Sequence, residues 1–456
     1  MAVMPSSLPT PLGGGEYGTT PGRPRSRYPV RVSLLPSLDP ALVSPVPGPR
    51  SRALAARLET VETRNVTCLA PDVPIFWERA AGANVWDADG NRFVDLGAGF
   101  GVANLGHAHP RVVAAVQMQA AELLHAMGDV QPARIKVELL EALTRRYPGG
   151  VPARATLGSS GSDAVEIALK TALLATGRAG VVAFEGAYHG LTLGALDATW
   201  RPAFRDPFTE RLAGRTSFAP FGDADAAASV AEVCAAPVGA VLVEPIQGRG
   251  GERIPPHGFL GALRRLCDAN GWLLILDEVY TGFGRTGRLF ACEHEGVVPD
   301  LLCVGKGLAS GLPFSACLGR AEVMDAWPPS EGEALHTQTF LGHPLGCAAA
   351  LATLAVLEEE RLPERAASEG AVALEQLRRR LEGRPGVVDV RGRGLLLGIE
   401  LDAPARAHAA CCAALSRGVI VLASGDEPRV LSVTPPLTIE RECLLRALDL
   451  LVESIP

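Results

Sequence analysis

The middle of the chain alternates short, wholly apolar runs with longer segments of helical periodicity. Four runs contain only apolar side chains and glycine: Gly180–Phe184, Val238–Val243, Trp272–Leu276 and Leu301–Val304. Strands that are covered by helices on both faces have such continuous runs, whereas half-exposed strands alternate between apolar and polar positions. The pattern therefore predicts an α/β fold built on a mostly parallel sheet flanked by helices.

Periodicity and alternation in the rest of the chain predict further elements. Helical spacing predicts helices over Arg52–Glu62, Pro110–Met127 and Ile135–Tyr147, a long Ala- and Leu-rich helix from Leu345 to about Glu360, and a closing helix from about Glu440. Gly82–Leu96 alternates around Asp-Ala-Asp-Gly, which predicts a β-hairpin. Gly394–Leu401 and Val419–Ala423 are strand candidates, and the C-terminal elements together predict a smaller α+β domain.

Residues 1–50 differ from the rest in composition. They are rich in Pro, Ser and Gly, their helical periodicity is weak, and they lack the apolar core of a secretory signal. We expect a disordered or poorly structured N-terminal arm, with an organelle transit peptide or a misassigned start site as alternatives. The rest of the chain is expected to form a large domain over residues 110–344 and a small domain from residues 51–109 and 345–456.

The composition excludes several classes of protein. Of the 456 residues, 47% are hydrophobic and 20% are charged, which is typical of globular chains and not of disordered or fibrous ones. A net charge of −7 argues against nucleic-acid binding, and no apolar run is long enough to span a membrane. Ten cysteines form no Cys-x-x-Cys pair, which indicates reduced thiols and a cytoplasmic location. His107 and His109 lack further ligands nearby, so we expect no metal and a structural role for both.

Lysine is scarce in this chain, which makes each lysine informative. Among the 43 Lys and Arg residues only Lys136, Lys170 and Lys306 are lysines. Codon bias accounts for most of this imbalance, but arginine stays protonated and forms no imine, so a retained lysine is more often needed as an amine. Lys306 follows the run Leu301–Val304 and lies between two glycines, which let a ligand approach the backbone closely.

Three further features fit one cofactor. Asp277 ends an apolar run, and the carboxyl end of a parallel strand points into the ligand crevice of an open α/β sheet. Ser159–Asp163 precede a helical segment, where they would either bind a phosphate or form a simple capping box. Tyr188 and His189 follow another apolar run and could stack on a flat heterocycle or pack in the core. An amine, a carboxylate, a phosphate site and an aromatic side chain are together what pyridoxal phosphate (PLP) requires.

The same residues lie in motifs of a known family. Over roughly residues 52–456 the chain resembles the class III, ω-amino acid type, PLP-dependent aminotransferases of fold type I. The most specific motif is LDEVYTGFGRTG at Leu276–Gly287, and GKGLASGLP follows at the matching spacing. GAYHG, VEPIQGRGG, HTQTFLGHPLGCAAALA, RGRGLLLGIEL and PPLTI occur in the expected order. The resemblance implies an enzyme that moves an amino group from an amino acid or amine to a keto acid.

The resemblance also implies a role for each matching residue. Lys306 would bind the cofactor aldehyde covalently and then carry protons, and Asp277 would pair with the pyridine nitrogen. Thr339 would reach the cofactor phosphate of a neighbouring subunit, which implies a homodimer with shared active sites. The other expected contacts are Gly161 and Ser162 at the phosphate, Tyr188 and Val279 on the two ring faces, His189 beside Tyr188, and Glu244 in a supporting role.

The chain departs from the family pattern at several positions. Tyr280 replaces a glutamine that often contacts the phenolic oxygen of the cofactor. Many members have a glutamate after PIQG and a partner arginine near PPLTI, where this chain has Arg249 and Ser432. We therefore hypothesise that Arg249 binds the carboxylate of the substrate through a bidentate contact. Arg249 could instead face solvent or pair with Glu252, and Arg429 is a second candidate for the carboxylate.

Two other functions remain open on the sequence. Amino-acid racemases and epimerases share this motif set, and the missing arginine weakens the case for glutamate as a substrate. A PLP-fold regulator or binding protein is a further alternative, against which the intact Lys306 and Asp277 argue. A nicotinamide-dependent dehydrogenase is excluded because no Gly-x-Gly-x-x-Gly motif lies between a strand and a helix.

Overall fold

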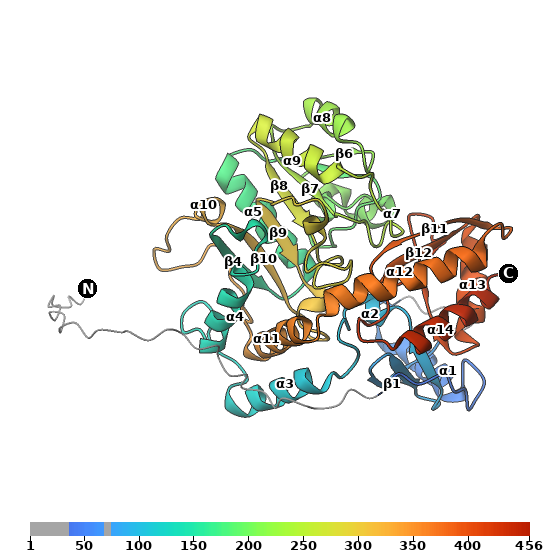
Figure 1. Cartoon of the computed structure of the whole chain (residues 1–456). Helices are drawn as coiled ribbons and strands as arrows, with labels where there is room; N and C mark the ends of the chain where they lie inside the picture. The colour runs from blue at the N-terminus through green and yellow to red at the C-terminus, as the bar shows by residue number, and fades with distance from the viewer. Residues whose placement is uncertain (1–35, 68–73) are drawn as a thin grey trace.

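A seven-stranded sheet forms the centre of the molecule (Figure 1). The computed structural model describes residues 36–67 and 74–456, and the strand order of this sheet is β4-β10-β9-β8-β7-β5-β6. The strands from β6 to β9 pair in parallel, whereas β10 is antiparallel to both of its neighbours. The strands are β4 (Ala153–Gly158), β5 (Gly180–Phe184), β6 (Thr216–Ala219), β7 (Val238–Val243), β8 (Leu273–Asp277), β9 (Leu301–Val304) and β10 (Ser315–Arg320).

The continuous apolar runs are strands with both faces covered. In β9, Leu301 and Cys303 belong to the core that includes α5 (Gly161–Thr176), and Leu302 and Val304 belong to the core on the opposite face. The helices α8 (Ala224–Glu232) and α9 (Phe259–Asn270) pack against β5–β8. The prediction of an α/β fold with a mostly parallel sheet flanked by helices is confirmed. Three strands of this sheet were not predicted. β4 and β6 are its edges, where partial exposure breaks the apolar run, and β10 is an interior strand that contains the polar residues Ser315 and Arg320.

Two four-stranded sheets lie beside the central one. The first has the order β1-β2-β3-β13 and contains the predicted hairpin as β2 and β3. The second has the order β11-β12-β15-β14 and is antiparallel throughout. The predicted strand Val419–Ala423 is divided between them, because the chain leaves the first sheet after Ile420 and enters the second at Leu422. The bounds are β1 (Trp77–Ala81), β2 (Asn84–Asp87), β3 (Arg92–Asp95), β11 (Val387–Arg393), β12 (Leu396–Leu401), β13 (Val419–Ile420), β14 (Leu422–Ser424) and β15 (Val430–Val433).

Most predicted helices occur with shifted ends. The largest shift is in α3, which ends at Glu122 although periodicity continues to Met127. No glycine or proline lies between Arg111 and Met127, so the pattern carries no stop signal there. In the structure Leu123 is already extended, with φ −160°. The longer helices are α1 (Pro49–Val61), α3 (Pro110–Glu122), α4 (Arg134–Thr144), α11 (Pro344–Glu359), α12 (Leu362–Leu381), α13 (Pro404–Leu415) and α14 (Arg441–Ser454). The short ones are α2 (Ala98–Gly101), α6 (Leu193–Asp197), α7 (Pro202–Arg205), α10 (Ala321–Met324) and the 3-10 turns η1 (Pro148–Gly150), η2 (Asp206–Arg211), η3 (Ala291–His294) and η4 (Lys306–Leu308).

The predicted N-terminal arm lies only partly within the described residues. Residues 1–35 are outside them, and residues 36–48 run along the hairpin β2–β3. The amide of Leu38 donates to Asn84 Oδ1 at 2.7 Å, and that of Val43 donates to Asn91 Oδ1 at 2.8 Å. Among the helices of the described residues, none is long and apolar enough to cross a membrane.

Candidate active site

A cavity of about 210 Å³ opens at the carboxyl ends of the parallel strands. Open α/β sheets bind their ligands at this edge. Every site residue predicted from the sequence lines the cavity except Thr339, which lies in the exposed segment between α10 and α11. The lining residues are Ser160, Gly161, Ser162, Tyr188, His189, Gly190, Glu244, Arg249, Asp277, Val279, Tyr280 and Lys306.

Lys306 presents its amine to this cavity from a strained position directly after β9. Its backbone has φ +41°, at the start of η4. A Cβ on the next residue, Gly307, would lie 2.2 Å from Nδ2 of Asn104, so no side chain fits there. The Nζ of Lys306 lies 3.9 Å from the centroid of the Tyr280 ring. Burial lowers the pKa of Lys306 to about 8, against the opposing effect of the Asp277 carboxylate, so the neutral amine is accessible near physiological pH.

Asp277 is held in place by two hydrogen bonds. It ends β8 and is only 4% exposed. Its Oδ2 lies 2.8 Å from Nδ1 of His189, and its Oδ1 accepts from the amide of Val279 at 3.1 Å. The amide of His189 in turn donates to Thr199 Oγ1 at 3.0 Å. Because each carboxylate oxygen has a second lone pair, Asp277 can still accept a hydrogen bond from an N–H group in the cavity.

The beginning of α5 provides free hydrogen-bond donors. Within the described part of the chain, the amides of Gly161 and Ser162 donate no hydrogen bond. A Cβ at Gly161 would lie 2.9 Å from Cγ1 of Val279, and one at Gly190 would lie 1.9 Å from Oγ of Ser162. The two glycines therefore keep the helix end open. The free amides and the helix dipole favour an anion at this position.

Glu244 connects two loops that border the cavity. Its Oε1 accepts from the amide of Tyr188 at 2.9 Å, and its Oε2 accepts from the amide of Gly248 at 3.1 Å. Burial raises the pKa of Glu244 to about 7. The side chain thus fixes the loop that carries the Tyr188 ring relative to the loop that carries Arg249.

The ring of Tyr280 packs against the amine of Lys306. A Cβ at Gly248 would lie 2.4 Å from Cδ1 of Tyr280, and one at Gly101 would lie 3.2 Å from its Cε2, so glycines make room for the ring on two sides. The Tyr280 hydroxyl lies 3.4 Å from Oγ1 of Thr434, and burial raises its pKa. The hydroxyl therefore remains protonated at neutral pH and can donate a hydrogen bond.

Arg249 lies at the edge of the cavity without an ion pair. Its guanidinium carbon is 4.8 Å from the centroid of the Tyr188 ring and 5.3 Å from that of Phe204. No carboxylate of the described chain segments lies within ion-pair distance of it. The alternative pairing with Glu252 is not formed, because the buried Glu252 carboxylate accepts from Ser424 at 2.8 Å and from Ser432.

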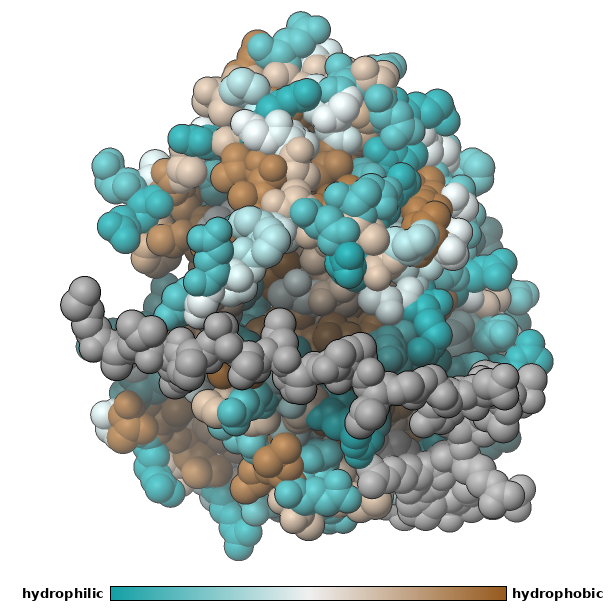
Figure 2. All heavy atoms as spheres, turned by 90° about the vertical axis from the view of Figure 1, so that its left-hand side faces the viewer, coloured by the Kyte–Doolittle hydropathy of each residue, from teal (hydrophilic) through white to brown (hydrophobic). Residues whose placement is uncertain are grey.

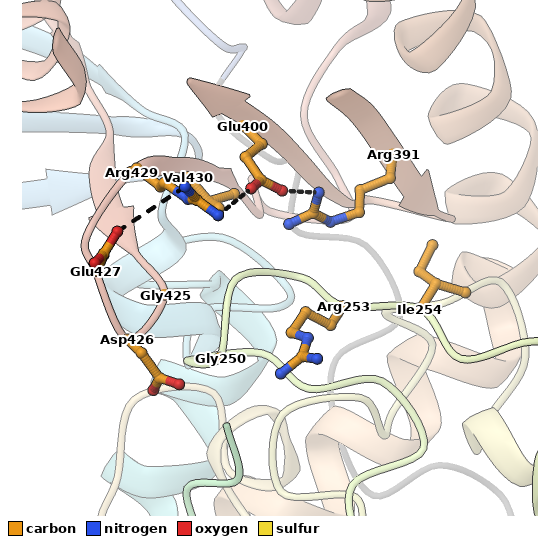
Figure 3. A pocket seen from close by; sticks show the side chains of 10 residues that line it. All are labelled: Gly250, Arg253, Ile254, Arg391, Glu400, Gly425, Asp426, Glu427, Arg429 and Val430. Atoms are coloured by element: carbon orange, nitrogen blue, oxygen red, sulfur yellow. Dashed lines mark hydrogen bonds and ion pairs between the residues drawn. The ribbon is translucent and has the colours of Figure 1, made fainter. Parts of the chain in front are cut away.

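The second arginine candidate lies elsewhere. Arg429 Nη2 is 3.0 Å from Oε1 of Glu400, and both residues line a separate cavity of about 660 Å³ (Figure 3). In that cavity Arg391 also pairs with Glu400, at 2.6 Å. The guanidinium groups of Arg391 and Arg429 are therefore already neutralised. Of the two arginine candidates, Arg249 is the one that lines the catalytic cavity, and it is exposed, as the solvent-facing alternative expects.

One structural residue near the site was not assigned from the sequence. Arg285 is 1% exposed and donates to the carbonyls of Leu395 and Pro435 at 2.9 and 2.5 Å, and to Asn104 Oδ1 at 2.7 Å. Asn104 is the side chain that faces Gly307. Arg285 thus ties the segment after β8 to the C-terminal sheet beneath Lys306. The only feature of the sequence that pointed to Arg285 was its position in the motif LDEVYTGFGRTG.

The donor set of the cavity fits PLP. An amine with a lowered pKa, a fixed carboxylate, two free amides at a helix start and an aromatic ring surround one small cavity. These groups match the aldehyde, the pyridine nitrogen, the phosphate and the ring of that cofactor.

Comparison with known proteins identifies the family. Residues 68–455 match the class III aminotransferases. An acetylornithine aminotransferase from Methanopyrus kandleri is 42% identical over 84% of this chain and 94% of its own length. A 4-aminobutyrate aminotransferase from Mycobacterium leprae is 39% identical over 90% of this chain and 96% of its own length. The structure of the ornithine aminotransferase from Toxoplasma gondii ME49 has a TM-score of 0.82 at 32% identity, covering 89% of this chain and 94% of that one.

The chain belongs to the class III aminotransferases. Enzymes of this class depend on PLP, and a further structure of the T. gondii ornithine aminotransferase, with a TM-score of 0.81 and 32% identity, is described with partial occupancy of PLP at its active site. This protein is therefore a PLP-dependent aminotransferase of fold type I. The activities of its relatives support amino-group transfer to a keto acid and give no support to racemisation.

Proposed function

We propose that the amino donor is an amino acid whose carboxylate is bound by Arg249, and that Lys306 moves the proton during transfer. The observation that carries this proposal is the proximity of two cations of different kinds at one cavity. Burial lowers the pKa of Lys306 to about 8, and the Arg249 guanidinium has no ion-pair partner among the described residues. The related enzymes are named for acetylornithine, 4-aminobutyrate and ornithine, all of which are amino acids.

Each side chain of the inner cavity has a task in this proposal. The bound cofactor supplies a conjugated ring that stabilises negative charge on the donor carbon. Lys306 Nζ would accept the proton from the donor carbon and then donate it to the cofactor carbon that carries the transferred amino group. Asp277 holds the proton of the pyridine nitrogen, and His189 Nδ1 keeps the carboxylate oriented. We assign the catalytic roles to Lys306 and Asp277.

The remaining contacts position the cofactor. The amides of Gly161 and Ser162 would bind the phosphate, and the Tyr188 ring and the Val279 side chain would cover the two faces of the pyridine ring. The Tyr280 hydroxyl would donate to the phenolic oxygen, as a replacement for the glutamine of other members. Glu244 would act through the two loops that it joins.

A paired donor assay tests the role of Arg249. The probes are 4-aminobutyrate and butylamine, which differ in the carboxylate. We expect the wild-type enzyme to prefer 4-aminobutyrate, and Arg249→Gln to raise its KM by at least about tenfold while leaving that of butylamine within twofold, because a charge-assisted contact is lost. The cofactor's absorbance change on addition of donor reports the reaction. Equal use of both probes by the wild-type enzyme would refute the carboxylate assignment.

We also propose a homodimer in which Thr339 completes the phosphate site of the partner subunit. Figure 2 shows apolar residues gathered in several patches on the side of the molecule that carries α3, α4 and α10. Two segments meet on this side: Oγ1 of Thr337 donates to Asp129 Oδ2 at 2.8 Å, and the rings of His125 and Phe340 are 5.5 Å apart. The exposed apolar residues of these segments are Met118, Leu123, Leu124, Met127, Val130, Leu335 and Phe340. Such a concentration is typical of a subunit interface.

Mixing inactive variants tests the shared site. Thr339→Glu places a carboxylate beside the partner's phosphate and should weaken cofactor binding, and Lys306→Ala removes the amine. In a mixed dimer one site would contain neither substitution. We expect the mixture to regain a measurable fraction of wild-type activity after subunit exchange. A mixture that stays inactive while sedimentation shows mixed dimers, or an active monomer, would contradict the proposal.

Two broader assignments belong to this proposal. A cytoplasmic location is supported by the ten cysteines without a Cys-x-x-Cys pair. The division into a large cofactor-binding domain over residues 110–344 and a small domain from residues 51–109 and 345–456 is supported by the sheets. All seven central strands lie between residues 153 and 320, and β13 joins the N-terminal sheet from the C-terminal part of the chain.

A further inference from the structure

A buried acid contacts the C-terminal sheet near Tyr280 without lining the catalytic cavity. Glu252 is 1% exposed, and its backbone has φ +48°, in the left-handed region that favours glycine. Nε of Arg391 donates to the carbonyl of Glu252 at 3.1 Å, and a Cβ on Gly398 of β12 would lie 3.0 Å from the Cβ of Glu252. The fold therefore holds Glu252 in a strained conformation, with its carboxyl group buried against this sheet.

Hydroxyl groups connect this carboxyl group with Tyr280. Ser432 Oγ, on β15, hydrogen-bonds to Oε1 of Glu252, and Ser424 Oγ, on β14, lies 2.8 Å from Oε2. The Tyr280 hydroxyl lies 3.4 Å from Oγ1 of Thr434. Because residues two apart in an extended segment share a face, Ser432 lies on the same side as Thr434, and its side chain also hydrogen-bonds to the Tyr280 hydroxyl. A chain of polar groups thus runs from Tyr280 through Ser432 to Glu252.

The direction of the hydrogen bonds in this chain depends on one proton. An ionised Glu252 can only accept, so Ser432 donates to it and the Tyr280 hydroxyl donates to Ser432. A protonated Glu252 donates to Ser432, whose own proton then goes to the oxygen of Tyr280. Since a hydroxyl group has a single proton, only the second arrangement leaves the Tyr280 proton free to point into the cavity.

The surroundings of Glu252 place its titration near neutral pH. Burial raises the pKa of Glu252 to about 7. The hydrogen bonds from its two serines and the charge of Arg391 lower this pKa, and the charge of Glu244 raises it. Burial, and after it the charge of Glu252, raise the pKa of Tyr280, so the hydroxyl keeps its proton. Both forms of the Glu252 carboxyl group are therefore populated near neutral pH.

We propose that Glu252 is a positioning residue of this active site, and that its protonation state decides whether the Tyr280 hydroxyl donates into the cavity or to Ser432. This role rests on the proposed function, in which the Tyr280 hydroxyl donates to the phenolic oxygen of the cofactor. With Glu252 protonated, the phenolic oxygen gains a hydrogen bond. With Glu252 ionised, it faces the lone pairs of the Tyr280 oxygen, so cofactor binding should weaken as Glu252 loses its proton.

A pH titration of the bound cofactor tests the inference. The absorption maximum of the wild-type holoenzyme should shift with a midpoint near pH 7, because the hydrogen bond to the phenolic oxygen is lost above it. Glu252→Gln keeps the shape of the side chain and can donate to Ser432 at every pH, so this shift should be absent. At about pH 8.5 the dissociation constant for PLP, measured by equilibrium dialysis, should be about fivefold lower in Glu252→Gln than in the wild type. At about pH 5.5 the two constants should agree within about twofold.

Three further substitutions locate the path. Ser432→Ala interrupts the chain of hydroxyl groups and should also abolish the shift. Ser424→Ala removes a hydrogen bond that favours the ionised carboxylate, so it should keep the shift and move its midpoint to higher pH. Thr434→Val removes the other partner of the Tyr280 hydroxyl and should leave the midpoint in place. Circular dichroism verifies that each variant is folded.

Two results would overturn the role of Glu252. Coinciding titrations of the wild type and Glu252→Gln are expected if Glu252 only fastens its loop to the sheet, or if another acid such as Glu244 causes the shift. A shift that survives in Ser432→Ala would show that the carboxyl group does not act through the hydroxyl chain.

Tyr280→Phe distinguishes this failure from that of the proposed function. If its absorption maximum and its dissociation constant for PLP equal those of the wild type at about pH 5.5, the contact proposed for Tyr280 is wrong. If Tyr280→Phe changes both values and Glu252→Gln leaves the titration unchanged, only the role of Glu252 fails.

Discussion

The inner wall of the catalytic cavity and its outer rim are built in different ways. The inner wall consists of Lys306, Asp277, His189 and Glu244, which lie at the carboxyl ends of strands of the central sheet or in the loops that follow them. Both carboxylates of the inner wall have two hydrogen-bond partners each. The outer rim consists of Arg201, Phe204, Arg249 and Asp426, in which both arginines lie within 5.5 Å of the centroid of the Phe204 ring. It comes from loops and a short helix, and its ion pair between Arg201 and Asp426 spans 3.8 Å.

The difference follows from what each part has to do. Groups that hold or move protons must keep their geometry, and strand ends fixed by buried hydrogen bonds provide it. Groups that recognise a substrate must exchange one partner for another, and partly exposed loop residues can do so at small cost. We therefore expect substitutions in the inner wall to change kcat and substitutions in the outer rim to change KM.

The largest effect is expected for Lys306→Ala. In the proposed mechanism the Nζ amine carries the donor proton, so its removal should lower kcat by about 10⁴-fold. Cofactor should still bind without the covalent link, through the start of α5 and Asp277. Steady-state rates and the absorbance of bound cofactor measure the two effects. Lys170→Ala removes an exposed lysine as a control and should leave kcat unchanged. A Lys306→Ala enzyme with normal turnover would end the proposed mechanism.

The next effect concerns Asp277→Asn. The amide keeps the size of the side chain but loses the charge that holds a proton on the pyridine nitrogen. We expect kcat to fall by about 10²- to 10³-fold, with KM for the donor changed little. Separate determination of kcat and KM for the donor tests this expectation. If Asp277→Asn raised KM and left kcat intact, the inner wall would behave like the outer rim and the comparison would fail.

A smaller effect is expected from pH. Covalent attachment of the aldehyde needs the neutral amine of Lys306, whose pKa is lowered by burial to about 8. The rate constant for attachment of PLP to the cofactor-free protein should therefore rise about tenfold per pH unit below pH 8 and level off above it. Stopped-flow absorbance follows the reaction. A rate that continues to rise to pH 10 would show that the amine titrates like an exposed lysine.

The smallest effect concerns stability and the loop that carries Arg249. Burial raises the pKa of Glu252 to about 7. Between about pH 4.5 and pH 7 the folded protein therefore holds a proton that the unfolded chain has lost, so this group's contribution to the free energy of unfolding falls as pH rises. The free energy of unfolding should therefore fall by about 1–3 kcal/mol less in Glu252→Gln than in the wild type between pH 5 and pH 7.

Denaturant unfolding at the two pH values measures this difference. Glu453→Gln, at an exposed glutamate near the C-terminus, is the matched control and should behave as the wild type. Glu244 and Glu278 also have pKa values raised by burial to about 7, so the wild-type slope should keep its sign in the variant. Equal slopes in Glu252→Gln and wild type would show that Glu252 is ionised in the folded protein.

Much of the fold was predictable because burial leaves a simple pattern. The strands β5, β7 and β9 coincide with apolar runs, since helices cover both of their faces. The edge strands β4 and β6 were missed because exposed positions admit polar residues. The end of α3 was missed because no residue before Gly128 stops a helix. At the site, Lys306 was singled out because lysine is rare in this chain and its neighbours are glycines, and the structure places it in the wall of the cavity.

The sequence by itself determined the class of the enzyme, and it predicted a set of site residues that strand ends and helix starts bring to one edge of the sheet. Only the tertiary structure decided what surrounds each charge. Glu252 is held by two serines from β14 and β15, Arg429 is neutralised by Glu400, and Arg249 has no ion-pair partner within the described residues. The serines that bind Glu252 are more than 140 residues away from it in the chain, and Arg429 meets Glu400 across the paired strands β12 and β15. No local sequence pattern encodes which of these residues come together.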